Sequence, residues 1–222
     1  MNLWNEFKTN QHKVIHKWAH YFPVYDKILS EYRNKTINVL EIGVLDGGSL
    51  ELWHRYFGPN ALIVGIDNHL QSNSKGLDFD TPMIQFRKGD QSDSVFLQSI
   101  IDEFKEFDII IDDGSHVCQH VITSFNKLYG SVTKNGMYII EDAHTSYWGS
   151  HGGGLKLKNS TIEFAKELID EINAVHTKIL PVTDFTKETN SISFYDSMIV
   201  FNKGGSRWKQ PVSSEGISNF KS

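Results

Sequence analysis

Two apolar segments of this 222-residue chain end in carboxylates, and a histidine follows the first of them. The first segment ends in IDDGSH, which contributes Asp112, Asp113 and His116, and the second ends in EDAH, which contributes Glu141 and Asp142. If the segments are neighbouring parallel strands, their carboxyl ends converge on the crevice where ligands bind. Carboxylates brought together repel one another unless they share protons, meet cations or bind a metal. Their oxygens suit hard cations such as Mg²⁺, Mn²⁺ or Ca²⁺, so Asp113, Glu141 and Asp142 are candidate metal ligands.

His116, three residues after Asp113, is the candidate base of this cluster. A hydroxyl bound to a divalent cation loses its proton more easily. A histidine with an ordinary pKa of about 6.5 is suited to take that proton near neutral pH. His144 stands close enough in the chain to compete for this role. Helix capping is the alternative function of such residues; Asp112 fits it and is left out of the metal set, and Ser115 fits it better than the role of a nucleophile.

An alternation of apolar runs and helical patterns predicts how these residues are positioned. Four runs are almost continuous in Ile, Val and Leu and end in or beside a carboxylate: 36–42, 61–67, 107–112 and 136–141. Helical patterns separate them, at 48–57, 93–105 and 117–131. Strands without polar interruptions are buried on both faces, as in a parallel sheet covered by helices. The order therefore predicts an α/β fold built from βαβ units.

The flanking segments differ in character from this central region. From 11 to 33, apolar side chains recur at helical spacing, and Pro23 predicts a kink or break in that helix. Near the other end, a helix at 160–174 precedes strand-like segments at 177–182 and 192–202. We expect these two segments to form an antiparallel hairpin that closes one edge of the sheet.

A glycine-rich turn, EIGVLDGGS, joins the first predicted strand to the following helix. Glycines at such a turn let the backbone approach a ligand closely and adopt positive φ. Gly43 and Gly47 do not follow the G-x-G-x-x-G spacing of dinucleotide-binding proteins, and the turn lacks the Gly-Lys-Ser/Thr of a P-loop. Asp67 ends the second strand, where a carboxylate can accept hydrogen bonds from a ribose, and Asp90 lies near the same sheet edge. The alternative is that these glycines only form tight turns.

Taken together, these features resemble the nucleoside pocket of class I S-adenosylmethionine-dependent methyltransferases. The resemblance implies a Rossmann-like fold with a mostly parallel seven-stranded sheet, an antiparallel edge strand and helices on both faces. It places the methionine end of S-adenosyl-L-methionine against Gly43 and Gly47, the ribose on Asp67, and the adenine beside Asp90 and Gln91. The full set of cofactor-binding residues expected from it is Glu41, Gly43, Gly47, Ser49, Asp67, Asp90, Gln91 and Asp112.

A more discriminating resemblance rests on six motifs in order: YFPVYD, LEIGVLDGGSL, YFGPNALIVGID, GDQSD, IDDGSH and EDAHTSYW. Over residues 15–150 they are similar to metal-dependent sugar O-methyltransferases of the mycinamicin and rhamnosyl type. The similarity implies Asp113, Glu141 and Asp142 as ligands of Mg²⁺ or Mn²⁺. It also implies that His116 is the general base and that Asp113 shares in catalysis. The acceptor residues expected from it are Tyr21, His144, Tyr147 and Trp148.

The sequence therefore predicts an S-adenosylmethionine-dependent, Mg²⁺-assisted O-methyltransferase that acts on a sugar hydroxyl. The acceptor is expected to be a surface polysaccharide, a nucleotide sugar or a glycosylated natural product. Three alternatives stay open: a catechol-type O-methyltransferase with the same metal geometry, an NAD-dependent oxidoreductase, and a non-catalytic ligand-binding module on this fold.

Composition excludes several other classes of protein. The net charge of −5 lacks the basic footprint of a nonspecific nucleic-acid binder, and the single Cys118 excludes a disulfide scaffold. No apolar run approaches the ~18 residues of a membrane span, and the N-terminal MNLWNEFKTN lacks the apolar core of a signal peptide. We expect a cytoplasmic homo-oligomer with no nucleic-acid or membrane partner.

The length suits one α/β domain with extensions. We expect residues 1–35 to form a helical extension on the acceptor or oligomer side. Residues 36–203 are predicted to form the methyltransferase domain, and residues 204–222 a polar tail.

Overall fold

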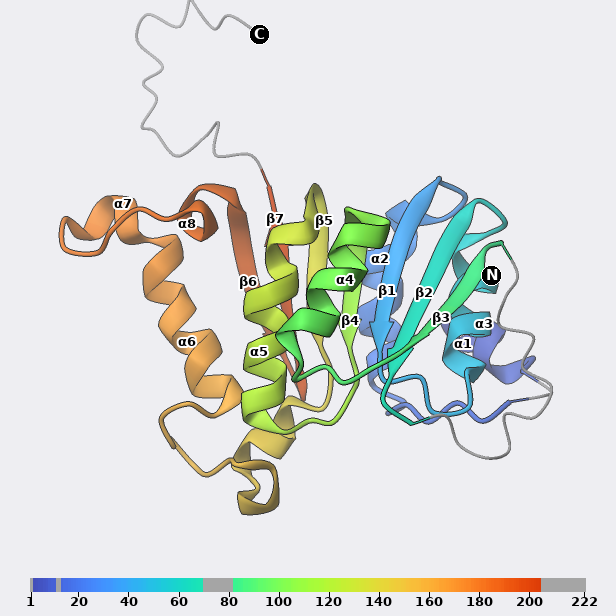
Figure 1. The fold of residues 1–222 in the computed structure, drawn as a ribbon, viewed down its shortest axis with the longest axis horizontal. Helices are drawn as coiled ribbons and strands as arrows, with labels where there is room; N and C mark the ends of the chain where they lie inside the picture. The colour runs from blue at the N-terminus through green and yellow to red at the C-terminus, as the bar shows by residue number, and fades with distance from the viewer. Residues whose placement is uncertain (1, 11–12, 70–81, 205–222) are drawn as a thin grey trace, which may run out of the picture.

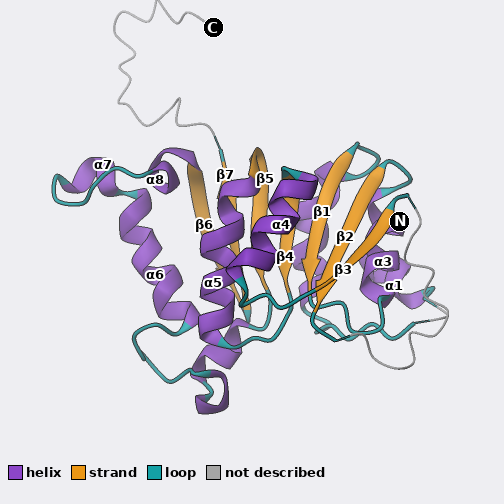
Figure 2. Ribbon diagram, viewed as in Figure 1, coloured by secondary structure: helices purple, strands orange, loops and turns teal. Residues whose placement is uncertain are grey.

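The computed structural model describes residues 2–10, 13–69 and 82–204, which contain one seven-stranded mixed sheet (Figure 1, Figure 2). The strands are β1 (Ile37–Ile42), β2 (Ala61–Asp67), β3 (Ile84–Lys88), β4 (Phe107–Asp112), β5 (Val132–Ile140), β6 (Thr189–Tyr195) and β7 (Met198–Lys203). Their order in the sheet is β3-β2-β1-β4-β5-β7-β6. The strands from β3 to β5 are parallel, and β7 runs antiparallel to both β5 and β6.

Helices cover both faces of this sheet. The α-helices are α1 (Leu3–Lys8), α2 (Tyr21–Leu29), α3 (Gly48–Phe57), α4 (Ser94–Phe104), α5 (Cys118–Leu128), α6 (Thr161–Ile172), α7 (Ala174–Thr177) and α8 (Asp184–Glu188). The 3₁₀ helices within the described residues are η1 (Ser30–Tyr32), η3 (Tyr129–Ser131), η4 (Ala143–Tyr147) and η5 (Gly149–His151). Helices α1, α2 and α3 pack on one face, and α4, α5 and α6 pack on the other (Figure 1).

The alternation of side chains along each strand explains the two layers. Consecutive side chains of a strand point to opposite faces. In β1, Val39 packs into the core under α1–α3, whereas Leu40 packs into the core under α4–α6. In β4, Ile109 and Ile110 divide in the same way. Because both faces exclude water, most positions of these strands are apolar, and the predicted doubly covered α/β sheet is confirmed.

Residues 13–20 differ from the prediction of a helix through the N-terminal region. They contain no helix, and α2 begins only at Tyr21. Pro23 lies in the first turn of α2, where its missing N–H group loses no helical hydrogen bond. The preceding stretch is held by distant partners, since Lys17 contacts groups that lie 96 and 124 positions away in the chain. These tertiary contacts override the local helical spacing.

The C-terminal hairpin lies later in the chain than predicted. Residues 178–182 form no strand, and the Ile179 side chain is exposed. The hairpin is formed by β6 and β7, which pair antiparallel. The run predicted as one strand at 192–202 is interrupted by a turn in which Ser197 has a φ of 63°. Because β7 pairs with β5, this hairpin forms one edge of the sheet.

Among the described residues, no helix combines the length and the apolar character needed to cross a lipid bilayer. Of the predicted polar tail at 204–222, all but Gly204 lies outside the described residues.

Candidate active site

A cavity of about 510 Å³ lies at the carboxyl ends of the parallel strands. Its walls come from the turn after β1, from the loops after β2, β3, β4 and β5, and from an extended segment that we call the strap, residues 13–18. Of the residues predicted to bind the cofactor, those that line the cavity are Gly43, Ser49, Asp67, Asp90 and Gln91. The others, Glu41, Gly47 and Asp112, do not line it.

Gly43 occupies a position that requires a glycine. Its φ is 88°, in the left-handed region, and a Cβ atom there would collide with the carbonyl oxygen of Asp113. The turn after β1 therefore touches the tip of β4 directly. This close approach brings the glycine-rich wall of the cavity next to the acidic residues.

Asp67 holds the glycine-rich turn in place. Its Oδ2 accepts hydrogen bonds from the backbone N–H groups of Val44, at 2.8 Å, and Leu45, at 3.3 Å. Its Oδ1 accepts a hydrogen bond from the N–H group of His69 at 2.9 Å. The carboxylate thus lies on the cavity wall while it also orders the backbone around it.

Gln91 connects the loop after β3 to the tip of β4. Its Oε1 accepts a hydrogen bond from the N–H group of Ser115 at 2.6 Å, and its Nε2 donates to Asp112 Oδ1 at 3.1 Å. Asp112 is buried and also accepts a hydrogen bond from the Tyr138 hydroxyl at 3.0 Å. The contacts of Asp112 are therefore with the protein, and they hold Gln91 against the cavity.

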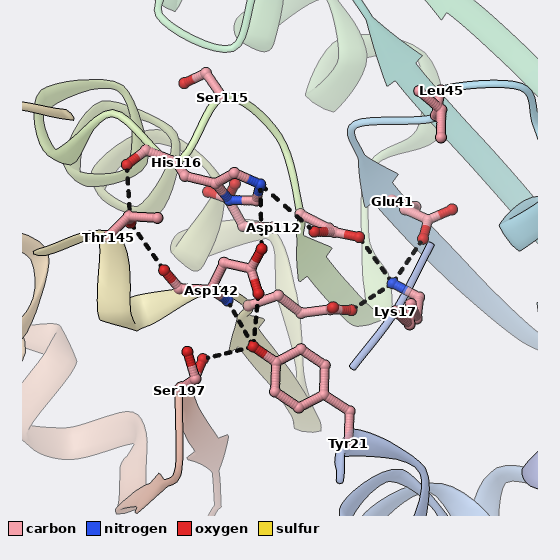
Figure 3. A network of polar contacts seen from close by, with 12 residues as sticks. Lys17, Tyr21, Glu41, Leu45, Asp112, Ser115, His116, Asp142, Thr145 and Ser197 are labelled. Carbon is pink, nitrogen blue, oxygen red and sulfur yellow. Dashed lines mark hydrogen bonds and ion pairs between the residues drawn. The ribbon is translucent and has the colours of Figure 1, made fainter. Parts of the chain in front are cut away.

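Asp113, His116 and Asp142 line the cavity and come together there. Figure 3 shows His116 and Asp142 pointing toward each other. His116 Nε2 lies 3.9 Å from Asp113 Oδ1 and 3.6 Å from Asp142 Oδ2. One possible ligand atom from each of the three lies within 4.8 Å of the other two. In the described part of the chain, these three residues form the group that could hold one metal ion.

The backbone conformation sets the direction of two of these side chains. His116 has a φ of 56° and Asp142 a φ of 51°, in the left-handed region that residues other than glycine rarely adopt. Thr145 Oγ1 lies 3.2 Å from the carbonyl oxygen of His116 and 2.8 Å from that of Asp142, which ties the two loops together. The buried Tyr21 hydroxyl donates to Asp142 Oδ1 at 2.7 Å. Tyr21, predicted as an acceptor residue, therefore positions a carboxylate of the cluster.

Glu141, the remaining predicted metal ligand, is bound by Lys17, a residue that the sequence analysis missed. Lys17 Nζ lies 2.6 Å from Glu141 Oε1, 2.8 Å from Asp113 Oδ2 and 3.6 Å from Glu41 Oε1 (Figure 3). The Tyr25 hydroxyl also donates to Glu141 Oε1. No spacing in the sequence signals these contacts, because they join residues that are far apart along the chain.

Burial dominates the electrostatics of this cluster. Loss of hydration raises the pKa of Asp113 and that of Glu141 to about 7, although Lys17 acts in the opposite direction. Burial lowers the pKa of Lys17, but the surrounding carboxylates outweigh this effect and hold that pKa well above its ordinary value. With pKa values raised to about 7, Asp113 and Glu141 bind protons near neutral pH, and a metal ion at the same oxygens would replace those protons. The donor set therefore fits a further hard cation.

The predicted acceptor residues include aromatic rings next to the acid cluster, the name we give to Asp113, His116, Glu141 and Asp142. The ring of His144 packs edge-on against Trp148, with centroids 4.9 Å apart, and against Trp18, with centroids 5.8 Å apart. His144 Nδ1 is hydrogen-bonded to the Ser197 hydroxyl. Trp148 and Tyr147 are about half exposed and do not line the cavity, whereas Trp18, which the sequence analysis did not select, lines it.

Comparison with curated proteins identifies clear relatives of this chain. It is 40% identical over 166 residues to the mycinamicin VI 2''-O-methyltransferase of Micromonospora griseorubida, an alignment that covers 70% of this chain and 40% of the relative. It is 34% identical over 167 residues to the 8-demethyl-8-alpha-L-rhamnosyl tetracenomycin-C 2'-O-methyltransferase of Streptomyces olivaceus, covering 71% of this chain and 43% of the relative. No protein-family model matches the chain.

The fold is also similar to a solved structure of the same group. The MycE methyltransferase from the mycinamycin biosynthetic pathway, in complex with Mg, SAH and mycinamycin VI, superposes with a TM-score of 0.79. The two are 30% identical, and the superposition covers 99% of this chain and 57% of MycE.

The chain spans about 40% of the length of the curated relatives it matches. Within that span, the sheet order, the antiparallel β7 and the sequence agree with this group. The chain therefore has the class I methyltransferase fold and is related to the S-adenosylmethionine-dependent sugar O-methyltransferases of the MycE type.

Proposed function

We propose that this chain is an S-adenosylmethionine-dependent, Mg²⁺-assisted O-methyltransferase that acts on a sugar hydroxyl. The observation that carries the proposal is the juxtaposition of Asp113, His116 and Asp142 with a cavity whose wall contains Gly43. Together these features provide a place for a methyl donor, a place for a divalent cation and a base, all within one crevice.

The cavity fits a nucleoside donor. Its volume of about 510 Å³ is in the range of small-molecule sites. Gly43 lines the cavity and lets the turn after β1 pack directly against the tip of β4, while Asp67, Asp90 and Gln91 offer polar groups along the same wall. We assign the methionine end of S-adenosylmethionine to Gly43 and the nucleoside to Asp67, Asp90 and Gln91.

The acid cluster fits Mg²⁺ or Mn²⁺. Asp113 and Asp142 would hold the ion, with Glu141 as the third carboxylate, and His116 faces the same point. When bound, a divalent ion lowers the pKa of an acceptor hydroxyl, and S-adenosylmethionine supplies the methyl group.

In this mechanism His116 Nε2 takes the proton of the acceptor hydroxyl. The hydroxyl oxygen forms a bond to the methyl carbon as the carbon–sulfur bond of the donor breaks, so no covalent enzyme intermediate is needed. Tyr21 fixes the Asp142 carboxylate through its hydrogen bond at 2.7 Å. Correct placement of the two reactants can supply effective molarities on the order of 10⁵ M, so positioning provides most of the acceleration.

The acceptor is proposed to be a glycosylated small molecule. The names of the relatives support this class, since one is named for mycinamicin VI and another for a tetracenomycin that carries a rhamnosyl group. The half-exposed rings of Tyr147 and Trp148, beside His144, suit contact with the apolar face of a pyranose. A surface polysaccharide or a nucleotide sugar is the other expected acceptor.

The test is a methyl-transfer assay with radiolabelled S-adenosylmethionine and a panel of glycosylated natural products, nucleotide sugars and catechols. We expect transfer to a sugar hydroxyl that requires Mg²⁺ and stops when EDTA is added. Transfer to catechols alone would favour the catechol-type alternative. Absence of S-adenosylmethionine binding together with binding of NAD would contradict the proposal.

A further inference from the structure

Lys17 carries a buried charge that the mechanism above does not use. Its side chain is 1% exposed, and its ammonium contacts Asp113, Glu141 and Glu41. The Trp53 ring lies below it, with the centroid 5.6 Å from Nζ. A lysine ammonium is costly to bury unless it is paired and hydrogen-bonded. The fold therefore places this residue specifically against the carboxylates.

Lys17 and His116 lie near different carboxylate oxygens of Asp113. Lys17 Nζ lies 2.8 Å from Oδ2, whereas His116 Nε2 lies 3.9 Å from Oδ1. On Glu141, the contacts of Lys17 and Tyr25 both fall on Oε1. The ammonium thus leaves the side of the cluster that faces His116 and Asp142 unobstructed for a metal ion.

The strap that carries Lys17 forms one wall of the donor cavity. Residues 14–18 line this cavity, and the N-terminal part of the strap rests on the first turn of α3. A Cβ atom on Gly48 would collide with the carbonyl oxygen of Val14, so the two backbones are in close contact. The Lys13 ammonium pairs with Glu51 at the same end. The strap is therefore attached to α3 at one end and to the acid cluster at the other.

We propose that Lys17 is a positioning residue for donor binding, because its ion pairs with Asp113 and Glu141 hold the strap across the cavity. This inference rests on the proposed function, since it takes the cavity to be the site of S-adenosylmethionine. Without the ammonium, the strap keeps its contacts with α3 and the ring contact of Trp18 with His144, but it loses its ion pairs with the residues at the strand tips. If it is then in place about a tenth of the time, the apparent Kd for the donor rises about tenfold.

The experiment measures the binding of S-adenosylhomocysteine by calorimetry, in EDTA, so that no metal contributes. We expect Lys17→Met to raise the Kd about tenfold or more relative to the wild type. Lys203→Met is the matched control, because Lys203 is also a buried, ion-paired lysine over an aromatic ring but does not line the cavity. Its Kd should stay within about twofold of the wild-type value, since the substitution is remote from the donor site.

A second variant separates strap attachment from general destabilisation. Lys17→Met leaves buried carboxylates without their counter-charge, whereas Lys17→Met/Glu141→Gln removes one of those charges. We expect the double variant to melt at a higher temperature than Lys17→Met and still to bind S-adenosylhomocysteine weakly. In both variants, limited digestion with chymotrypsin should cut faster after Trp18 and at an unchanged rate after Trp148.

Wild-type affinity in either folded variant, or unchanged cleavage after Trp18, would overturn the role of Lys17. If the wild-type protein itself did not bind S-adenosylhomocysteine or S-adenosylmethionine, the proposed function would fail instead. The two failures are thus distinguishable.

Discussion

At the scale of single residues, His116 has two possible roles. Its Nε2 faces both Asp113 and Asp142, as either a base or a third metal ligand would. Neutral imidazole nitrogen serves both purposes. The left-handed backbone at His116 and Asp142 persists only because surrounding contacts, such as those of Thr145, determine it.

Replacing the imidazole separates these two roles. As a base, His116→Ala should lower kcat by roughly 10²–10⁴-fold while the Kd values for S-adenosylhomocysteine and Mn²⁺ stay unchanged. The measurements are steady-state kinetics, calorimetry and Mn²⁺ electron paramagnetic resonance. Loss of Mn²⁺ binding would assign His116 as a ligand. Full activity in His116→Ala and its loss in His144→Ala would make His144 the base.

The aromatic group tests where the acceptor binds. Removing the half-exposed indole in Trp148→Ala should cost about 1 kcal/mol of acceptor binding, which raises KM about fivefold with little change in kcat. The Kd for S-adenosylhomocysteine should not change, because Trp148 does not line the cavity. Trp4→Ala is the control, since Trp4 is similarly exposed but packs against Phe7 and Phe22. A KM unchanged in Trp148→Ala would remove this residue from the acceptor site.

At the scale of elements, the contact between the turn after β1 and the tip of β4 joins the donor cavity to the acid cluster. The register of β1 on β4 pairs Ile42 with Asp112, so the next residues, Gly43 and Asp113, meet directly. Asp113 N–H also donates to the Ile42 carbonyl oxygen at 2.9 Å. A side chain at Gly43 would separate these two tips.

Gly43→Ala should therefore lower the free energy of unfolding by about 1–3 kcal/mol, the cost of a strained left-handed residue, with the steric clash in addition. It should also weaken S-adenosylhomocysteine binding. Urea denaturation and calorimetry measure the two effects. Gly130→Ala is the matched control, since a Cβ atom there meets nothing within 4 Å. Equal stability of the two variants would show that the close approach at Gly43 is unimportant.

At the scale of the whole molecule, a ligand that binds only the folded chain stabilises it. At about 100 times its Kd a ligand contributes about 2.7 kcal/mol. For a protein of this size that corresponds to a rise in Tm of roughly 5–10 °C. We expect both Mn²⁺ and S-adenosylhomocysteine to raise the Tm of the wild type.

The variant Asp142→Asn should abolish the rise caused by Mn²⁺ and keep that caused by S-adenosylhomocysteine, because the ion pairs of Lys17 are with Asp113, Glu141 and Glu41. Differential scanning fluorimetry with each ligand, and with EDTA, measures this. A Mn²⁺-dependent rise that persists in Asp142→Asn would place the metal elsewhere. Assembly into a homo-oligomer stays a prediction, which analytical ultracentrifugation of the wild type can test.

The sequence by itself determined the sheet and the edge of the sheet at which the candidate site residues lie. The runs that form β1, β2 and β4 are mostly Ile, Val and Leu because both sheet faces are covered, so a local pattern indicates their burial. Carboxylates at the ends of these runs must lie at the carboxyl edge of a parallel sheet. Asp113, Asp142 and His116 were predicted to meet there, and the structure brings them together.

Only the tertiary structure decided how the N-terminal segment and the C-terminal hairpin are used. The helical spacing before Tyr21 is a local signal, and the ion pairs of Lys17 with Asp113 and Glu141 outweigh it. The position of the hairpin likewise depends on β7 finding β5 in the sheet. Contacts between residues that are distant in the chain leave no periodic pattern in the sequence. Their free energy arises only when the folded elements meet and exclude water from both partners.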